Sequence, residues 1–110
     1  MAKDIETINA IIQQYVADVK KEMPIDKVYL YGSYANGTQR DDSDVDLCFF
    51  SQAFETERSL DVLTRLFYLK IKYDNELLIE PNAFPSSELY NDNPFVKEIL
   101  RKGHEITIHQ

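Results

Sequence analysis

The sequence predicts an α/β (α+β) domain in which helices pack on a single mixed β-sheet. Two observations carry this prediction. Some segments repeat apolar residues at steps of three and four, whereas others are short runs rich in β-branched and aromatic residues, and the two kinds alternate along the chain. A chain of 110 residues can also bury one sizeable core. We therefore expect residues 1–110 to form one domain.

The first helix is predicted over residues 4–22, where Asp4 can cap the start and Pro24 prevents extension. Its apolar stripe consists of Ile5, Ile8, Ile12, Tyr15 and Val19. Two short strands follow, at 26–32 and 44–50. Their connection is too short for a parallel crossover, which needs about a dozen residues or more. The two strands are thus predicted to run antiparallel, or to be separated by a single helical turn.

A second helix is predicted over residues 55–70, which contain neither glycine nor proline. Its apolar residues are Leu60, Leu63, Leu66, Phe67 and Leu69. The third strand is predicted at 76–84, where Pro81 indicates a sheet edge or a strand end.

The last helix is predicted to follow Asn93, a good capping residue, with Pro94 at its first position. Gly103 is typical of the position just after a helix. A final short strand is predicted from Glu105 to His109.

Composition limits the classes of partner. Nineteen acidic residues against twelve basic ones, a net charge of −7, disfavour a long nucleic acid, because its phosphates require a basic face. A small nucleotide that carries a divalent cation is compatible with this charge. Cys48 is the only cysteine, and no segment has the apolar length of a leader or a membrane span. We expect a cytoplasmic protein with no membrane partner.

The stretch YGSYANGTQRDDSDVDL, residues 31–47, concentrates the candidate chemistry. Strand side chains alternate between faces, so Asp44 and Asp46 point the same way, beside Gly32 and Ser33 at the end of the preceding strand. Two carboxylates about 4 Å apart repel by about 4 kcal/mol at an effective dielectric of about 20. A cation between them removes this cost. Mg²⁺, which prefers oxygen ligands and substrate phosphates, is the predicted ion, with a nucleoside triphosphate as its companion.

Two other motifs, the P-loop and the calcium-binding loop, do not match residues 31–47. The spacing of Gly32 and Gly37 imitates a P-loop, but Thr38 and Gln39 replace its Lys and Ser/Thr. The aspartates imitate a calcium loop, but Leu47 replaces its glycine.

The stretch resembles the GSxAxG(x)nSDxDL motif of the DNA polymerase beta nucleotidyltransferase superfamily, and specifically its minimal nucleotidyltransferase (MNT) branch. The resemblance implies a polymerase beta-like fold. It implies that Asp44 and Asp46 bind metal and are catalytic, that Gly32 and Ser33 bind the triphosphate, and that a later strand supplies a third carboxylate.

Glu80 is our prediction for that third carboxylate, near the end of the third predicted strand; Asp74 and Glu76 are the other candidates. Arg40 is interpreted either as a phosphate-binding residue or as a neutralising partner of the neighbouring aspartates. Tyr31 is interpreted mainly as a core residue, with base stacking as the alternative.

The resemblance further implies a reaction and a setting. A hydroxyl would attack the α-phosphorus of ATP with the help of two Mg²⁺ ions, so that AMP is transferred and pyrophosphate leaves. The acceptor would be a tyrosine of a HEPN-domain toxin, which would make the protein an antitoxin in a hetero-oligomer. The alternative is a non-catalytic nucleotide- and metal-binding module that neutralises a partner by covering it.

Overall fold

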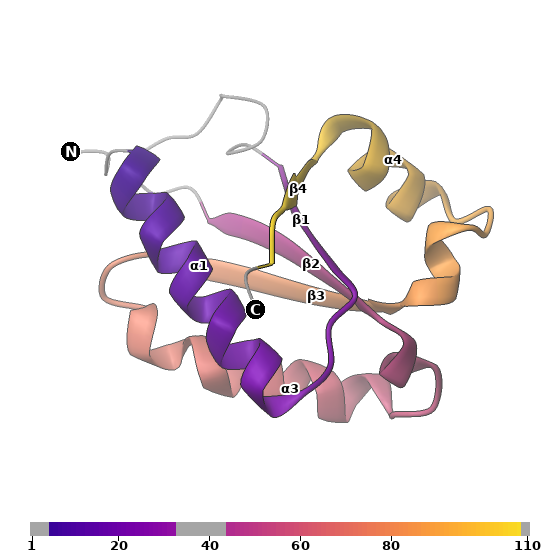
Figure 1. Cartoon of the computed structure of the whole chain (residues 1–110), viewed down its shortest axis with the longest axis horizontal. Coiled ribbons are helices and arrows are strands. Elements are labelled where there is room, and N and C mark those ends of the chain that lie inside the picture. The colour runs from indigo at the N-terminus through magenta and orange to yellow at the C-terminus, as the bar shows by residue number, and fades with distance from the viewer. Residues whose placement is uncertain (1–4, 33–43, 109–110) are drawn as a thin grey trace.

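The computed structural model describes residues 5–32 and 44–108; residues 1–4, 33–43 and 109–110 lie outside this description. Within it, helices pack on one mixed four-stranded sheet (Figure 1), which confirms the predicted fold class. The main elements are α1 (Ile5–Glu22), β1 (Lys27–Tyr31), β2 (Val45–Ser51), α3 (Ser59–Lys70), β3 (Ile79–Pro85), α4 (Pro94–Lys102) and β4 (His104–Ile106). Three short 3₁₀ helices connect them: η1 (Gln52–Glu55), η2 (Ile71–Tyr73) and η3 (Ser86–Leu89).

The strand order in the sheet is β3-β2-β1-β4. Strand β1 pairs antiparallel with both β2 and β4, which confirms the antiparallel reading of the first two strands. Strand β3 pairs parallel with β2, because α3 provides the long crossover that a parallel connection needs. Pro81 lies in β3 at the sheet edge, as its missing N–H requires.

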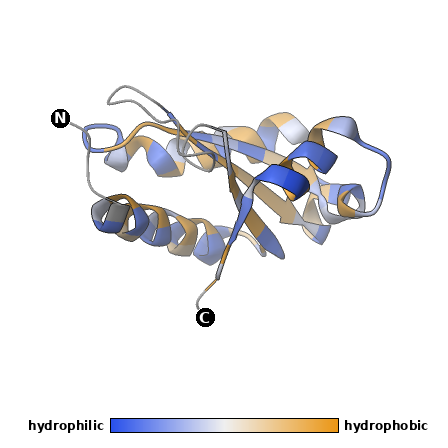
Figure 2. Ribbon diagram, turned by 90° about the horizontal axis from the view of Figure 1, so that it is seen from above, coloured by the Kyte–Doolittle hydropathy of each residue, from blue (hydrophilic) through white to orange (hydrophobic). Residues whose placement is uncertain are grey.

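Alternation along β2 separates the two faces of the sheet. Val45, Leu47 and Phe49 belong to the larger core, which α1 and α3 cover. Cys48 and Phe50 belong to a smaller cluster with residues of α4. Figure 2 shows that the helices carry both hydrophobic and hydrophilic residues along their length, as is typical of helices that cover a sheet with one side. Even-numbered residues of β2, including position 46, therefore face the α4 side.

One prediction about the second helix is corrected. The helix begins at Ser59 rather than 55, after η1 and a turn. Leu60 and Phe67 are 66% and 38% exposed, because they share a stripe of α3 that turns away from the sheet. The buried residues of this helix are Val62 and Leu66.

The third strand begins later than predicted. The backbone N–H groups of Glu76 and Leu77 both donate to the carbonyl of Tyr73, at 2.9 Å each, so this stretch forms a turn after η2. Strand β3 starts at Ile79, which places Glu80 near its beginning and not near its end.

The last helix begins as predicted. Asn93 Oδ1 accepts hydrogen bonds from the N–H groups of Phe95 and Val96, at 3.0 and 3.3 Å. The final strand is shorter than predicted and ends at Ile106, while His109 lies outside the described residues. No helix in the described part of the chain is long and apolar enough to cross a membrane.

Candidate active site

Strand pairing sets three polar side chains in a row across the sheet. In the register of the strands, Asp46 on β2 lies opposite Tyr31 on β1 and opposite Glu80 on β3. Asp44 precedes β2 by one residue and is exposed. The row lies where β1 ends and where β2 and β3 begin, on the α4 side of the sheet.

The charges in this row act on one another. Partial burial raises the pKa of Asp46, and the neighbouring carboxylates of Asp44 and Glu80 raise it further. Both causes penalise the ionised carboxylate. The surroundings of Asp46 therefore disfavour its ionised form, and a cation bound next to the carboxylate would remove this penalty.

Gly32 lies in a turn directly beside the carboxylate of Asp46. Its φ is +78°, a left-handed conformation that glycine adopts readily. A Cβ atom placed on Gly32 would overlap Asp46 Oδ2. Glycine therefore serves two needs here, because it allows the turn and leaves room for the carboxylate.

Tyr31 is the third member of the row, and the sequence indicated it mainly as a core residue. Burial raises the pKa of its phenol, and the acidic groups of Cys48, Asp46 and Glu80 add to this, while a hydrogen bond with the Asn82 side chain opposes it. Asn82 follows Glu80 by two positions and so shares its face of β3. That spacing was the one signal that could have identified Asn82.

The remaining predicted residues have different locations. Ser33 and Arg40 lie outside the described residues. Asp74 caps η2 and pairs with Lys70 at 2.9 Å, and Glu76 lies in the turn before β3. Neither is in register with Asp46, whereas Glu80 is. The catalytic and metal-binding roles of Asp44, Asp46 and Glu80 stay predictions.

The donor chemistry of the row suits a hard cation. Within residues 5–32 and 44–108, no group of three or more His, Cys, Asp or Glu side chains is arranged to hold a metal ion. Mg²⁺, however, binds through one or two carboxylates and completes its octahedron with water and substrate phosphates. The neighbouring carboxylates of Asp44, Asp46 and Glu80, beside the turn at Gly32, are compatible with this mode of binding.

A family model described as polymerase beta nucleotidyltransferase matches residues 6–109. The chain belongs to the polymerase beta nucleotidyltransferase family. A comparison with curated proteins found no significant match.

Solved structures agree with the fold of this nucleotidyltransferase. A protein assigned as a minimal nucleotidyltransferase has 25% identity and a TM-score of 0.64, over 94% of this chain and 97% of that one. A protein of Sulfolobus solfataricus assigned as a nucleotidyltransferase has 18% identity and a TM-score of 0.65, over 96% and 89%. A chain of a toxin-antitoxin crystallised with AMP-PNP has 19% identity and a TM-score of 0.58, over 89% and 74%.

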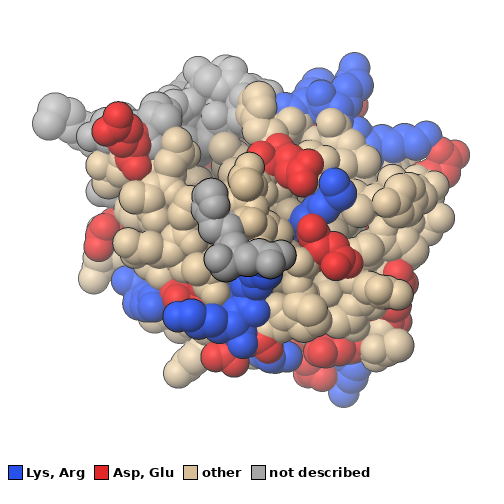
Figure 3. All heavy atoms as spheres, in the orientation of Figure 1, with Lys and Arg blue, Asp and Glu red and all other residues tan. Residues whose placement is uncertain are grey.

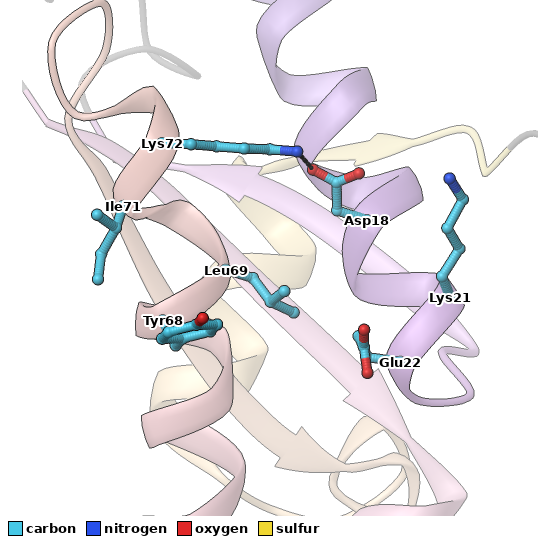
Figure 4. Close-up of a pocket in the computed structure, with 7 residues that line it drawn as sticks. All are labelled: Asp18, Lys21, Glu22, Tyr68, Leu69, Ile71 and Lys72. Carbon is cyan, nitrogen blue, oxygen red and sulfur yellow. Dashed lines mark ion pairs between the residues drawn. The ribbon is translucent and has the colours of Figure 1, made fainter.

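A hollow of about 420 Å³ lies elsewhere on the nucleotidyltransferase, between the end of α1 and the end of α3 (Figure 4). Its carboxylate Asp18 pairs with Lys72 at 2.8 Å and also accepts a hydrogen bond from Tyr73. Burial raises the pKa of Asp18, but these two hydrogen bonds, together with the positive charges of Lys72 and Lys21, lower the pKa overall. Asp18 is thus fully paired, and it lies on the side of the sheet that α1 and α3 cover, away from the carboxylate row. We therefore interpret Asp18 and Lys72 as structural residues.

The charge distribution also agrees with the composition. On the face seen in Figure 3, Lys and Arg side chains are interspersed with Asp and Glu. The described residues there form no continuous basic surface for a long nucleic acid.

Proposed function

We propose that this nucleotidyltransferase transfers a nucleoside monophosphate, most plausibly AMP from ATP, to a hydroxyl acceptor in a Mg²⁺-dependent reaction. The observation that carries the proposal is the register of Asp46 with Glu80 beside the Gly32 turn. Family membership gives the reaction class, and the neighbour crystallised with AMP-PNP supports an adenine nucleotide. The proposal treats residues 1–110 as a single minimal nucleotidyltransferase domain that works in the cytoplasm.

The reaction forms a bond between the acceptor oxygen and the α-phosphorus, and breaks the bond between that phosphorus and the oxygen bridging to the β-phosphate. Pyrophosphate leaves, and the hydroxyl loses its proton. Attacking and leaving oxygens lie on opposite sides of the phosphorus. Bound Mg²⁺, two ions in the proposal, would neutralise the charge that develops on these oxygens.

The proposal gives each reactant a side of Asp46, following the order of the strands. Asp46 is central and, with Asp44, would hold the metal ions. Gly32 lies on the β1 side, where its turn would bind the leaving phosphates with Ser33 and Arg40. Glu80 lies on the β3 side of Asp46, where it would complete the carboxylate set and favour loss of the hydroxyl proton.

The proposed acceptor is a tyrosine of a partner protein, a HEPN-domain toxin, and the proposed biological role is that of an antitoxin. Support comes from the structural likeness to a chain of a toxin-antitoxin. The net charge of −7 favours association with a basic partner. The two proteins would form a hetero-oligomer.

A mass measurement on the partner tests this function. The protein is incubated with Mg²⁺, each of the four nucleoside triphosphates and the partner that co-purifies with it. The partner is expected to gain the mass of one nucleoside monophosphate, with AMP preferred. Asp44→Asn should abolish the gain while the complex survives. Asp61→Asn, an exposed aspartate on α3, is the matched control and should retain full transfer.

The second candidate function is a non-catalytic module that neutralises its partner by covering it. It would keep nucleotide and metal binding, and the net charge of −7 favours the association with a basic partner on which it relies. In that case the partner's mass stays constant with every triphosphate, and Asp44→Asn neutralises the partner as well as the wild type does.

A further inference from the structure

A small hollow adjoins the carboxylate row on the β1 side. It has a volume of about 240 Å³, and its lining consists of Tyr31, Gly32, Phe95, Glu98, Ile99 and Lys102. Tyr31 ends β1, Gly32 follows it in the turn, and the other four residues lie on α4. Because Gly32 also contacts the carboxylate of Asp46, the hollow and the candidate active site share a wall.

We propose that this hollow binds the nucleobase of the triphosphate, an inference that rests on the proposed function. The first argument is position. Glu80 lies on the β3 side of Asp46, the proposed acceptor side, whereas the hollow adjoins Asp46 on the β1 side through Gly32. The ribose and base of a triphosphate whose α-phosphorus lies beside Asp46 can therefore extend into the hollow without crossing the path of the acceptor.

The second argument is the character of the lining. Phe95 is 43% exposed and meets Tyr31 edge to face, with ring centroids 5.8 Å apart. Phe84 supports Phe95 from behind at 5.7 Å. A ring that is held by two aromatic neighbours and is still partly open offers a stacking surface for a base.

The third argument is charge. Glu98 pairs with Lys102 at 3.4 Å and with Arg101 at 2.6 Å, so the polar rim of the hollow carries both signs. The Glu98 carboxylate would repel phosphates, whereas it can accept a hydrogen bond from an amino group of a base. Lys102 can donate to a ring nitrogen or a carbonyl. A neutral heteroaromatic ring satisfies both.

Size agrees with this assignment. Pockets that enclose a whole drug-sized ligand measure about 300–1,000 Å³. The observed hollow is smaller, so it takes only the base, and the ribose extends from it past Gly32 towards the α-phosphate beside Asp46.

The test compares Mg·ATP with Mg·tripolyphosphate, which lacks the base, by calorimetric titration. Phe95→Leu keeps the apolar volume but removes the stacking face. We expect it to weaken Mg·ATP binding by a factor of about 5 to 150, the range that stacking supplies, and to leave Mg·tripolyphosphate binding unchanged. Tyr90→Leu, which removes an aromatic ring that is 85% exposed outside the hollow, is the matched control and should change neither.

A second pair of variants tests the rim. Lys102→Gln should weaken Mg·ATP binding more than Mg·tripolyphosphate binding, while Lys97→Gln, on the same helix outside the hollow, should leave both unchanged. Independently of any variant, nuclear Overhauser effects should connect the base protons of bound Mg·ATP to the side chains of Phe95 and Ile99.

The outcomes separate this inference from the proposed function. If the wild type binds both probes but Phe95→Leu binds Mg·ATP normally, or the base gives no contact to Phe95, the hollow is not the base site and the proposed function stands. If Phe95→Leu weakens both probes equally, the residue acts on the phosphates or the fold, and the assignment is again wrong. If the wild type binds neither probe, the proposed function itself is overturned.

Discussion

The carboxylate of Asp46 occupies the space that a side chain on Gly32 would fill. Asp46 lies on β2, and Gly32 follows the last residue of the adjacent strand β1 in a turn with a positive φ of 78°. The glycine thereby brings a turn of the backbone against a carboxylate without an intervening side chain. Any larger residue at position 32 has to move one of them.

Gly32→Ala is expected to destabilise the protein and to abolish nucleotide transfer. The left-handed conformation alone costs an alanine about 1–2 kcal/mol, and the overlap with Asp46 adds to this. Chemical denaturation followed by circular dichroism gives the free energy of unfolding, and the partner's mass gives the activity.

A double-mutant cycle isolates the overlap. In an Asp46→Ala background, Gly32→Ala should cost less, because the Oδ2 atom is gone and only the strain of the backbone remains. Equal costs in both backgrounds would mean that the carboxylate does not press on position 32.

Asp46→Asn is expected to raise the melting temperature at neutral pH in EDTA while it abolishes transfer. The pKa of Asp46 is raised in the folded protein, so folding disfavours the ionised form and the charge destabilises the fold at neutral pH. The stability gain of the variant should shrink as the pH falls through the raised pKa, and should vanish below the ordinary value of 3.8, where both folded and unfolded wild type are protonated. Thermal scans of both proteins across this range measure the difference.

Asp18→Asn provides a control of opposite sign. Burial raises the pKa of Asp18, but hydrogen bonds from Lys72 and Tyr73 and the charges of Lys72 and Lys21 together lower it, so the ionised form stabilises the fold at neutral pH. This variant should lower the melting temperature, and the deficit should disappear as the pH falls through the lowered pKa. A loss of stability in Asp46→Asn at neutral pH would contradict the electrostatic account of the row.

Much of this structure follows from local sequence rules. Asn93 and Pro94 set the start of α4, and the short connection after β1 forces an antiparallel pair. The alternation of β2 identified Asp44 and Asp46 together. The pairing of Glu80 with Asp46, in contrast, depends on the parallel register of β3, which α3 and the turn at Tyr73 determine over a long range. Sequence could nominate Glu80, but only the assembled sheet sets it beside Asp46.

The apolar stripe of α3 illustrates the other limit. Periodicity alone allowed Leu60 and Leu66 to share the core, yet Leu60 is 66% exposed and Leu66 is fully buried. Which of two neighbouring stripes faces the sheet depends on how α3 docks beside α1 and β3, and no local signal specifies that docking.

The same contrast yields a prediction on stability. Leu66→Ala should cost about 2–5 kcal/mol, because it leaves a cavity in the larger core. Leu60→Ala removes the same atoms from an exposed site of the same helix and should change the free energy of unfolding by less than about 0.5 kcal/mol. Urea unfolding of both variants measures this. A large loss at position 60 would show that this stripe is covered by another part of the protein.

Cys48 tests the packing of α4 behind the candidate site. Its side chain is fully buried next to Phe50, Val96 and Ile99, and burial raises the pKa of its thiol from 9.0 to about 12. Thiolate is the reactive form, so at mildly alkaline pH the native thiol should react with iodoacetamide on the order of a thousandfold more slowly than the same thiol in denaturant. Mass spectrometry of the alkylated protein gives both rates. Rapid alkylation without denaturant would mean that α4 does not cover this face of the sheet. The α4 residues would then not line the hollow beside Gly32.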